Sequence, residues 1–466
     1  MADRQIVIIG GGFSGTALAI HLARLGSAGL KVIVIEPRAQ LAQGVAYGTV
    51  DPAHRINVPA ARMQLSVAEE GDFDRWLRAE GGLKQDDKAL WTDGSLYPQR
   101  GRFAAYILDK LAAALETSPV QVTHVQDYAV ALQNAEVLTA SGDKYHADEV
   151  VLAISHPPPA VPRQLQQVLQ DHPGLIANPW RTEALIGVEK SARVAIIGSG
   201  LTMSDVVASL YRQGHHGPIL AFSRRGQLPR PNLTGESQPR PLDYRRPQAD
   251  SARAWLRRVR QEVAQAALEG QPWQGVLDDI RLNGQQIWQR LSLKEQRRFL
   301  RHLRPWWDVH RYRIAPQVSE VLSLLQQNGR LKVLAASLKQ VATDKETIIL
   351  TLKARGKAAM ETSRVDKLIV TTGPAHGELL KSNALLKQLA TAGAIQPDPL
   401  ALGILVDAHS RTINRHGKSN EHMYVVGPAA RGRFGELMGL PQVAQHAESL
   451  AQQLLCGSPI DPTGRE

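Results

Sequence analysis

The segment Gln5-Ile-Val-Ile-Ile9-Gly-Gly-Gly-Phe-Ser-Gly15 is an apolar run that enters a glycine-rich turn. Apolar residues at helical spacing follow over residues 16–25, and a second apolar run at 31–35 ends at Glu36. This order predicts a strand, a tight turn, a helix and a parallel strand. Glycines in such a turn let a pyrophosphate approach the backbone, and an acid about twenty residues later can bind a ribose diol. The stretch therefore predicts a dinucleotide site in preference to a plain strand-to-helix turn.

The same pattern returns in the middle of the chain. An apolar run at 193–197 precedes Gly198-Ser-Gly-Leu-Thr-Met-Ser-Asp205, a helix is expected to about residue 211, and a strand is expected at 219–222. Ser223, Arg224 and Arg225 then stand where NAD-binding proteins carry an acid. Guanidinium groups suit a 2′-phosphate, so this site should prefer NADPH to NADH. The alternative is that both arginines only face solvent.

Further strands are expected at 149–154 and 367–372, and a strand at 423–426 should precede a helix at 442–455. A proline-rich stretch near residues 230–247 leads into helical patterns at 251–267 and 284–303. The predicted fold class is α/β, with two Rossmann-like dinucleotide-binding domains and a helical insertion. The FAD-binding domain should comprise residues 1–185 and 376–466, the NADPH-binding domain 186–235 and 316–375, and the insertion 236–315.

Composition narrows the class of protein. The 466 residues are 43% hydrophobic and 21% charged, as in ordinary globular proteins, and they contain no apolar run long enough for a membrane span. The only cysteine is Cys456, which excludes a redox disulfide and a thiolate metal cluster. No metal site is therefore expected. The first residues read as a strand instead of a signal peptide, so we expect a cytoplasmic protein without a membrane partner.

Positive charge is concentrated in the predicted insertion. The whole chain carries a net charge of +11, and residues 236–315 hold 16 Arg or Lys against 9 Asp or Glu. Such a segment could attract an acidic protein, an anionic small molecule or nucleic acid, or it could simply form solvated helix faces. No nucleic-acid fold signature accompanies it, so a nucleic-acid partner is not expected.

Over nearly its whole length the sequence resembles the bacterial FAD/NAD(P)-binding oxidoreductases that are related to flavin-dependent monooxygenases. The resemblance implies a glutathione-reductase-like architecture, with an NADPH domain inserted into an FAD domain. The segments that carry it are 10–15, 44–49, 54–63, 178–180, 198–205, 223–226 and 302–307.

Residues 57–63 look like a stretch of flavin monooxygenases whose asparagine lies beside the reactive edge of the flavin. By that resemblance Asn57 is the candidate catalytic residue, stabilising a C4a-hydroperoxide; alternatively the segment only forms a turn against the isoalloxazine. At the last strand the sequence departs from the pattern of the family, which weakens the assignment of flavin contacts there by resemblance. Pro428 follows Gly427 where many flavoproteins have an aspartate that contacts the ribityl chain, and a backbone amide near Gly427 could serve instead.

Substrate identity is expected to reside in the insertion, which contains five of the eight tryptophans: Trp255, Trp273, Trp288, Trp306 and Trp307. Aromatic walls with cationic anchors would suit an anionic organic substrate. The alternative is that the tryptophans pack a small core of the insertion itself. The candidate substrate residues are Trp306, Trp307, His310 and Arg311, with Arg313 a further candidate.

The sequence thus predicts an NADPH-dependent FAD oxidoreductase, and the resemblance favours a monooxygenase that acts through a flavin C4a-hydroperoxide on a small, anionic or amino-bearing substrate with molecular oxygen. The alternatives are a reductase that passes electrons to an acidic carrier protein and a non-catalytic nucleotide-binding protein. The predicted cofactor-binding residues are Gly10, Gly12, Phe13, Ser14, Gly15, Glu36, Pro37, Arg38, Asn57, Val58, Met63, Gly198, Ser199, Gly200, Leu201, Thr202, Asp205, Ser223, Arg224, Arg225, Gly373, Gly427, Pro428, Pro441 and Gln442.

Overall fold

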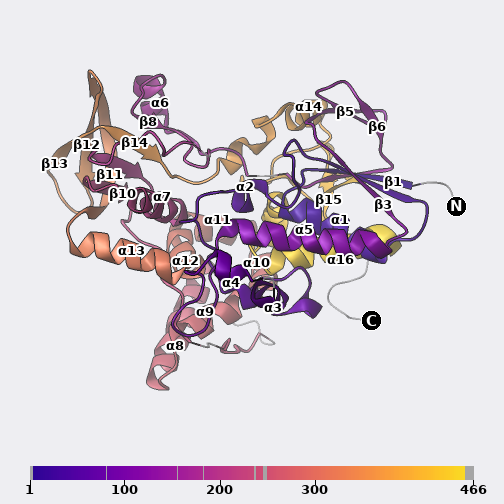
Figure 1. Ribbon diagram of the computed structural model, residues 1–466, viewed down its shortest axis with the longest axis horizontal. Helices are drawn as coiled ribbons and strands as arrows, with labels where there is room; N and C mark the ends of the chain where they lie inside the picture. Colours follow the sequence, from indigo (N-terminus) through magenta and orange to yellow (C-terminus); the bar gives the residue numbers. More distant parts are fainter. Residues whose placement is uncertain are drawn as a thin grey trace.

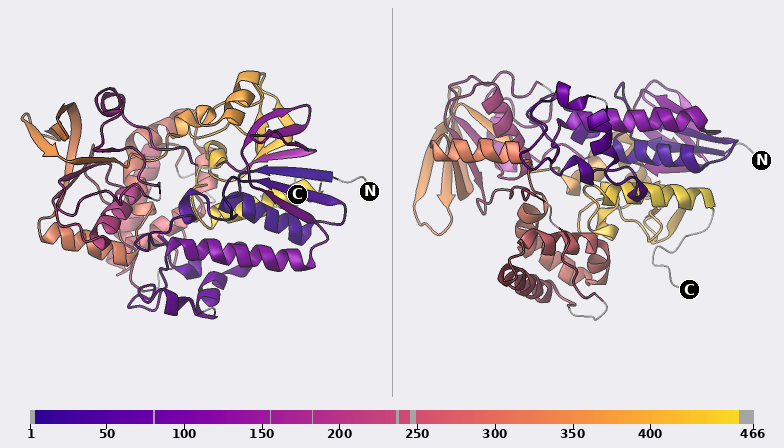
Figure 2. Two further views of the ribbon diagram at one scale, coloured as in Figure 1. Left: turned by 45° about the horizontal axis from the view of Figure 1, so that its top comes forward. Right: turned by 60° about the horizontal axis from the view of Figure 1, so that its bottom comes forward.

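The structure is a computed structural model that describes residues 4–79, 81–154, 156–181, 183–235, 238–244 and 249–456. Two large sheets lie at opposite ends of the molecule, and a group of helices projects beneath them (Figures 1 and 2). Both sheets are parallel at their centres, and glycine-rich turns connect strands to helices in each. The predicted α/β class with Rossmann-like units is confirmed.

The first sheet has six strands in the order β15-β16-β7-β1-β2-β3, and only β15 runs antiparallel to its neighbour. Its central strands are buried because helices α1, α5 and α16 pack together beside it (Figure 1). The strands are β1 (Arg4–Ile9), β2 (Leu30–Ile35), β3 (Gln121–Val125), β7 (Glu149–Leu152), β15 (Arg411–Ile413) and β16 (Ser419–Val425), and the helices are α1 (Phe13–Leu25), α5 (Arg100–Thr117) and α16 (Gln442–Cys456).

The second sheet has seven strands in the order β13-β12-β11-β10-β9-β14-β8, with β11, β12 and β13 forming an antiparallel meander. Helix α7 (Leu201–Arg212) packs against α13 (Pro316–Gln327), and α6 (Arg163–Leu169) packs against β11. The strands are β8 (Leu175–Ile176), β9 (Val194–Ile197), β10 (Ile219–Ser223), β11 (Leu331–Asp344), β12 (Thr347–Ala354), β13 (Met360–Val365) and β14 (Lys367–Val370).

Smaller elements complete these two bodies. A three-stranded antiparallel sheet packs against α14 through β4. Short helical turns connect the longer elements around the first sheet. The small sheet consists of β4 (Ala129–Gln133), β5 (Glu136–Thr139) and β6 (Lys144–His146), and its helix is α14 (Ala384–Ala392). The short helices are α2 (Gly44–Tyr47), α3 (Asp72–Ala79), α4 (Gly82–Gln85), α15 (Arg431–Phe434), η1 (Ala60–Arg62), η2 (Val67–Glu69), η4 (His376–Lys381) and η5 (Pro428–Ala430).

The helices of the insertion form the body that projects below the sheets in the right-hand view of Figure 2. The helix expected at 284–303 is interrupted, because Leu291 is extended and the Ser292 side chain caps a new helix by accepting from the amide of Glu295. A π-helical segment follows. The elements are α8 (Ala252–Leu268), α9 (Trp273–Leu282), α10 (Gly284–Arg290), α11 (Leu293–Arg298), η3 (Phe299–Leu303) and α12 (Arg304–Arg311).

The predicted domain limits stay a prediction. Strand β8 at Leu175–Ile176 pairs with β14 of the second sheet, ahead of the limit drawn at residue 185. The predicted start of the insertion, residue 236, lies outside the described residues. No helix in the described ranges has the length and apolar character that crossing a membrane requires.

Candidate functional site

The first glycine-rich turn brings β1 and α1 into close contact. Gly10 has a φ of +108°, and its amide donates to the carbonyl of Ile35 over 2.9 Å. A Cβ on Gly15 would lie 1.9 Å from the carbonyl oxygen of Gly10. Only glycine at position 15 therefore lets the helix begin this close to the strand.

Space is open above the middle glycine of that turn. A Cβ on Gly12 would meet only Gly44, whose Cα would lie 3.4 Å away. Gly12 is the N-cap of α1 and makes no side-chain capping bond, so the first amides of the helix remain available to an anion. The cradle fits a pyrophosphate. Phe13, by contrast, has a buried ring that contacts Tyr47 and Phe103, so its side chain belongs to the core.

The acidic residue at the end of β2 is held by the same turn. Glu36 is 4% exposed, and its Oε2 accepts a hydrogen bond of 2.9 Å from the amide of Gly11. Its Oε1 accepts from both the amide and Nη1 of Arg38, at 3.1 and 2.9 Å. Oε2 accepts only one of these bonds and has a second lone pair, so Glu36 can still accept a hydroxyl of a ribose. Pro37 joins these two residues and is half-buried.

The last parallel strand ends against the first turn. Gly427 has a φ of +84°, and a Cβ there would lie 2.4 Å from Oγ of Ser14. Its amide donates to Nδ1 of His446 over 3.1 Å, while Nε2 of His446 lies 2.8 Å from Oγ of Ser410. Burial lowers the pKa of His446 to about 4, which keeps the ring neutral and able to accept at Nδ1. The sequence did not point to this histidine, which lies on an ordinary amphipathic helix.

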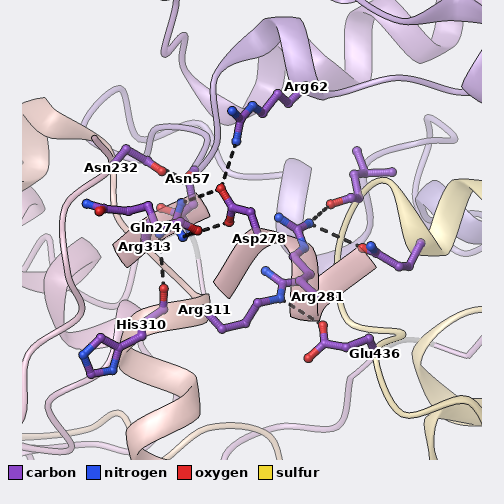
Figure 3. Close-up of polar contacts among 12 residues, drawn as sticks. Asn57, Arg62, Asn232, Gln274, Asp278, Arg281, His310, Arg311, Arg313 and Glu436 are labelled. Carbon is purple, nitrogen blue, oxygen red and sulfur yellow. Dashed lines mark hydrogen bonds and ion pairs between the residues drawn. The ribbon is translucent and has the colours of Figure 1, made fainter. Parts of the chain in front are cut away.

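The remaining residues predicted at the flavin lie on two segments, 57–63 and 428–442. The carbonyl oxygen of Asn57 accepts from Nδ2 of Asn232 over 2.9 Å, and its own side-chain amide makes no hydrogen bond with a described residue (Figure 3). Val58 is half-buried and Met63 is buried. In the segment that follows β16, Pro428 begins η5 directly after Gly427, and Pro441 precedes α16. Gln442, the first residue of α16, accepts a hydrogen bond of 3.4 Å from Nη2 of Arg281.

The second glycine-rich turn repeats the first at the other sheet. Gly198 has a φ of +117°, and a Cβ there would lie 2.5 Å from the carbonyl oxygen of Thr371. Gly200 is the N-cap of α7, and a Cβ at this position would have no described atom within 4 Å. This leaves room for a phosphate over the helix start and its residues Leu201 and Thr202. Gly373, with a φ of +84°, also faces open space.

Serine and arginine residues line the loop after β10. Oγ of Ser199 donates to the carbonyl of Gln227 over 2.6 Å and lies 2.8 Å from Oγ of Ser223. Arg224 is exposed and has no hydrogen bond or ion pair with the described residues. Arg225 instead reaches the insertion: its Nη2 donates to the carbonyl of His302 over 3.3 Å, and its guanidinium lies 5.7 Å from the ring centre of Trp306.

Asp205, predicted to contact the nucleotide, forms an ion pair with another side chain of the protein. Its carboxylate forms a buried ion pair with Arg100 of α5, with Nη1 to Oδ2 at 2.8 Å and Nη2 to Oδ1 at 2.9 Å. The pair joins α7 of the second sheet to a helix of the first. The carboxylate of Asp205 therefore connects the two glycine-rich units, and its predicted role at the nucleotide stays a prediction.

A cavity of about 880 Å³ opens inside the insertion, and all five of its tryptophans line it together with His310. Trp273 and Trp307 also pack against the small apolar core that contains Leu277, so this pair contributes both to a core and to the wall of the cavity. His310 is bonded to its own helix, with Nδ1 2.7 Å from the carbonyl oxygen of Trp306.

Ion pairs join the insertion to segments that belong to the first sheet's part of the chain (Figure 3). Nε of Arg311 donates to Oε2 of Glu436 over 2.9 Å, and Nε1 of Trp307 donates to Oε1 of the same carboxylate over 2.9 Å. Arg311 thus acts through Glu436 and is not itself among the cavity's lining residues. Nearby, Asp278 pairs with Arg313 at 2.8 Å and with Arg62 at 3.4 Å. Part of the basic excess is therefore structural.

Comparison with known proteins supports the nucleotide-binding interpretation. Residues 7–157 match the model of the FAD-NAD(P)-binding family. The sequence matches no curated protein. Among solved structures, an ornithine hydroxylase from Pseudomonas aeruginosa is 15% identical with a TM-score of 0.61, over 97% of this chain and 100% of that one. An L-lysine 6-monooxygenase from Pseudomonas syringae is 15% identical with a TM-score of 0.60, over 98% and 99%.

A further similar structure was solved with cofactors. The ornithine N-hydroxylase from Kutzneria sp. 744, described with reduced FAD, NADP⁺ and L-ornithine, is 16% identical with a TM-score of 0.59, over 97% of this chain and 98% of that one. At these identities the likeness establishes a shared fold. Together with the family match it shows that residues 7–157 form a FAD/NAD(P)-binding domain. Within the described residues, no cluster of His, Cys, Asp and Glu is suited to hold a metal ion.

Proposed function

We propose that this protein is an NADPH-dependent FAD monooxygenase that acts on a small organic molecule bound in the cavity of the insertion. The cavity carries the proposal. Its wall includes Arg431, Gly435, Glu436 and Met438, which come after β16 and after Gly427, the residue that lies against Ser14 of the first glycine-rich turn. A substrate in this cavity would therefore lie next to the segments expected to hold the flavin.

The residues of this chain would bind and orient two nucleotides. Gly12 and the start of α1 would hold the FAD pyrophosphate, and Glu36 would hold its adenosine ribose. Gly200 and Arg224 would hold NADPH at the second sheet. When bound, FAD supplies the electron transfer from NADPH and the activation of oxygen. The protein then has to exclude water and present the substrate, for which an apolar cavity is suited.

The similar solved structures support oxygen as the electron acceptor, since they are hydroxylases and monooxygenases of ornithine, lysine and cadaverine. Asn57 remains the proposed group beside the reactive edge of the flavin. Its side-chain amide is available for that role, because the contact that holds this residue to Asn232 uses the backbone carbonyl.

Stopped-flow spectroscopy tests the proposal. The FAD-loaded protein is reduced anaerobically with NADPH and mixed with oxygenated buffer while the flavin spectrum is recorded. A transient spectrum unlike those of oxidised and reduced flavin is expected, and Asn57→Ala should shorten its lifetime. Direct return to the oxidised spectrum, with rapid reduction of an added carrier protein such as cytochrome c, would overturn the proposal in favour of a reductase.

A further inference from the structure

One end of the cavity contains a buried arginine without an anionic partner. Arg431 is 5% exposed and lines the cavity. Its Nε donates to the carbonyl of Leu402 over 3.2 Å, and its Nη1 lies 2.9 Å from Sδ of Met438. Its Nη2 has no hydrogen-bond partner among the described residues, and none of their carboxylates forms an ion pair with it. Burial and the charge of Arg304 lower the pKa of Arg431 to about 10, so it stays cationic at neutral pH.

Asp308 and Asp398 are close enough for their charges to act on this cation, but neither forms an ion pair with it, and burial raises the pKa of Asp398. Arg304, which also lines the cavity, pairs with Asp308 at 3.3 Å, and burial raises the pKa of Asp308. Glu436 is already engaged by Arg311 and Trp307. A buried charge without a counter-charge is unfavourable, because its desolvation is uncompensated. The free Nη2 therefore indicates a place for an anionic group that this chain does not provide.

Most of the rest of the cavity wall is apolar, and its other polar members are Arg230, Arg260, Gln274, Arg304, Asp308, His310, Tyr312 and Glu436. The five tryptophans come from α8, α9, α10 and α12, and leucine and valine side chains of the same helices fill the wall between them. A volume of about 880 Å³ is at the upper end of the range of about 300–1,000 Å³ that is usual for sites of drug-sized ligands. Such a wall offers little to a short, highly polar amine, whereas flat ring systems pack well against indole faces.

We propose that the ligand of this cavity, and on the proposed function the substrate, is an organic anion with a bulky ring-bearing apolar body. Its anionic group binds Nη2 of Arg431, and its body lies against the tryptophans. The sequence left both an anionic and an amino-bearing substrate open, and this assignment selects the anionic one. It also names Arg431, which sequence reasoning did not single out, as a specificity residue.

Isothermal titration calorimetry on the FAD-loaded protein, without NADPH, tests this assignment on wild type alone. The probes are 1-naphthylacetate, its neutral amide 1-naphthylacetamide, the cation 1-naphthylmethylamine, and L-ornithine. The carboxylate should bind at least about ten-fold more tightly than the amide, as expected for one charge-assisted hydrogen bond, and the two amines should bind more weakly still. Equal affinities for the three naphthalenes, or tighter binding of either amine, would overturn it.

Arg431→Gln should bring the affinities for the carboxylate and the amide within about two-fold of each other at unchanged FAD content. Arg433→Gln is the matched control, because Arg433 lies on the same short helix but is exposed, and it should keep the wild-type preference. If Arg431→Gln loses FAD and keeps the carboxylate preference, Arg431 serves the flavin and the assignment fails. Binding is measured without turnover, so a failed oxygen reaction with an intact carboxylate preference would refute the monooxygenase and leave the ligand class standing.

Discussion

The two glycine-rich turns share a backbone design but differ in how they present the residue predicted to select the nucleotide. At the first turn Glu36 is buried, and both of its oxygens are bonded to the backbone or side chain of neighbouring residues. At the second turn Arg224 is exposed and has no partner among the described residues, while Arg225 contacts the insertion. Glu36 is therefore part of the folded core, whereas Arg224 is a surface charge, so the NADPH preference predicted for it should depend on ionic strength.

The largest effect is expected from filling the space over the first turn. In Gly12→Val the new side chain would occupy the place of the pyrophosphate, since only Gly44 approaches that position. FAD affinity should fall at least about 100-fold, or about 2.7 kcal/mol. The flavin absorbance of the purified protein and its titration with FAD measure this. Gly200→Val is the matched control: it should keep FAD and lose reduction by NADPH. Full flavin content in Gly12→Val would show that the pyrophosphate binds elsewhere.

Removing the exposed arginine should have the next largest effect. Arg224→Ala should weaken NADPH binding about ten- to a hundred-fold, because a charge-assisted bond to a phosphate contributes about 1.5–3 kcal/mol. Use of NADH should stay nearly unchanged, since only the phosphate contact is lost. Anaerobic flavin reduction at varied concentrations of each nucleotide measures both constants. If the wild type uses NADH and NADPH equally well, the predicted preference is wrong.

Arg225→Ala should reduce the NADPH preference by only a few-fold, because this guanidinium is shared with the carbonyl of His302 and the ring of Trp306. The fluorescence of Trp306, which is 47% exposed, should change in this variant even without nucleotide. Arg224→Ala serves as the control that leaves the fluorescence unaltered. A loss of NADPH preference larger than that of Arg224→Ala would reverse the assignment of the two arginines.

The smallest of the expected effects is that of salt, which should act on the NADPH site and leave the FAD site unchanged. Raising the ionic strength from about 0.05 to about 0.5 M should lower the NADPH preference a few-fold, because exposed charges are screened over a Debye length of about 10 Å at 0.1 M. FAD retention should not change, since Glu36 is buried. Parallel measurements of the nucleotide preference and of released flavin test the contrast. Release of FAD by salt at constant NADPH preference would contradict it.

Local patterns were sufficient for the strands that lead into and out of the two glycine-rich turns and for the turns themselves. The strand expected at 219–222 is β10 at Ile219–Ser223, and the helix expected at 442–455 is α16 at Gln442–Cys456. Buried parallel strands need continuous apolar runs, and a turn that begins a helix over a phosphate site needs glycines, so both leave signals within about ten residues. The apolar pattern at 284–303 suggested one continuous helix. The structure has a break there, because the Ser292 side chain caps the start of a new helix.

Tertiary packing decided the contacts that join distant segments. Asp205 pairs with Arg100 across 105 positions, which depends on how the folded chain brings the first residue of α5 to α7. The bond from Gly427 to His446 and the free Nη2 of Arg431 follow from the way β16, α15 and α16 fold over the first turn. The sequence determined that tryptophans would gather in the insertion, but a helical repeat is the same for a packed core and for a lined cavity. Only the spacing of the helices, set by all their contacts together, left the space between those side chains open.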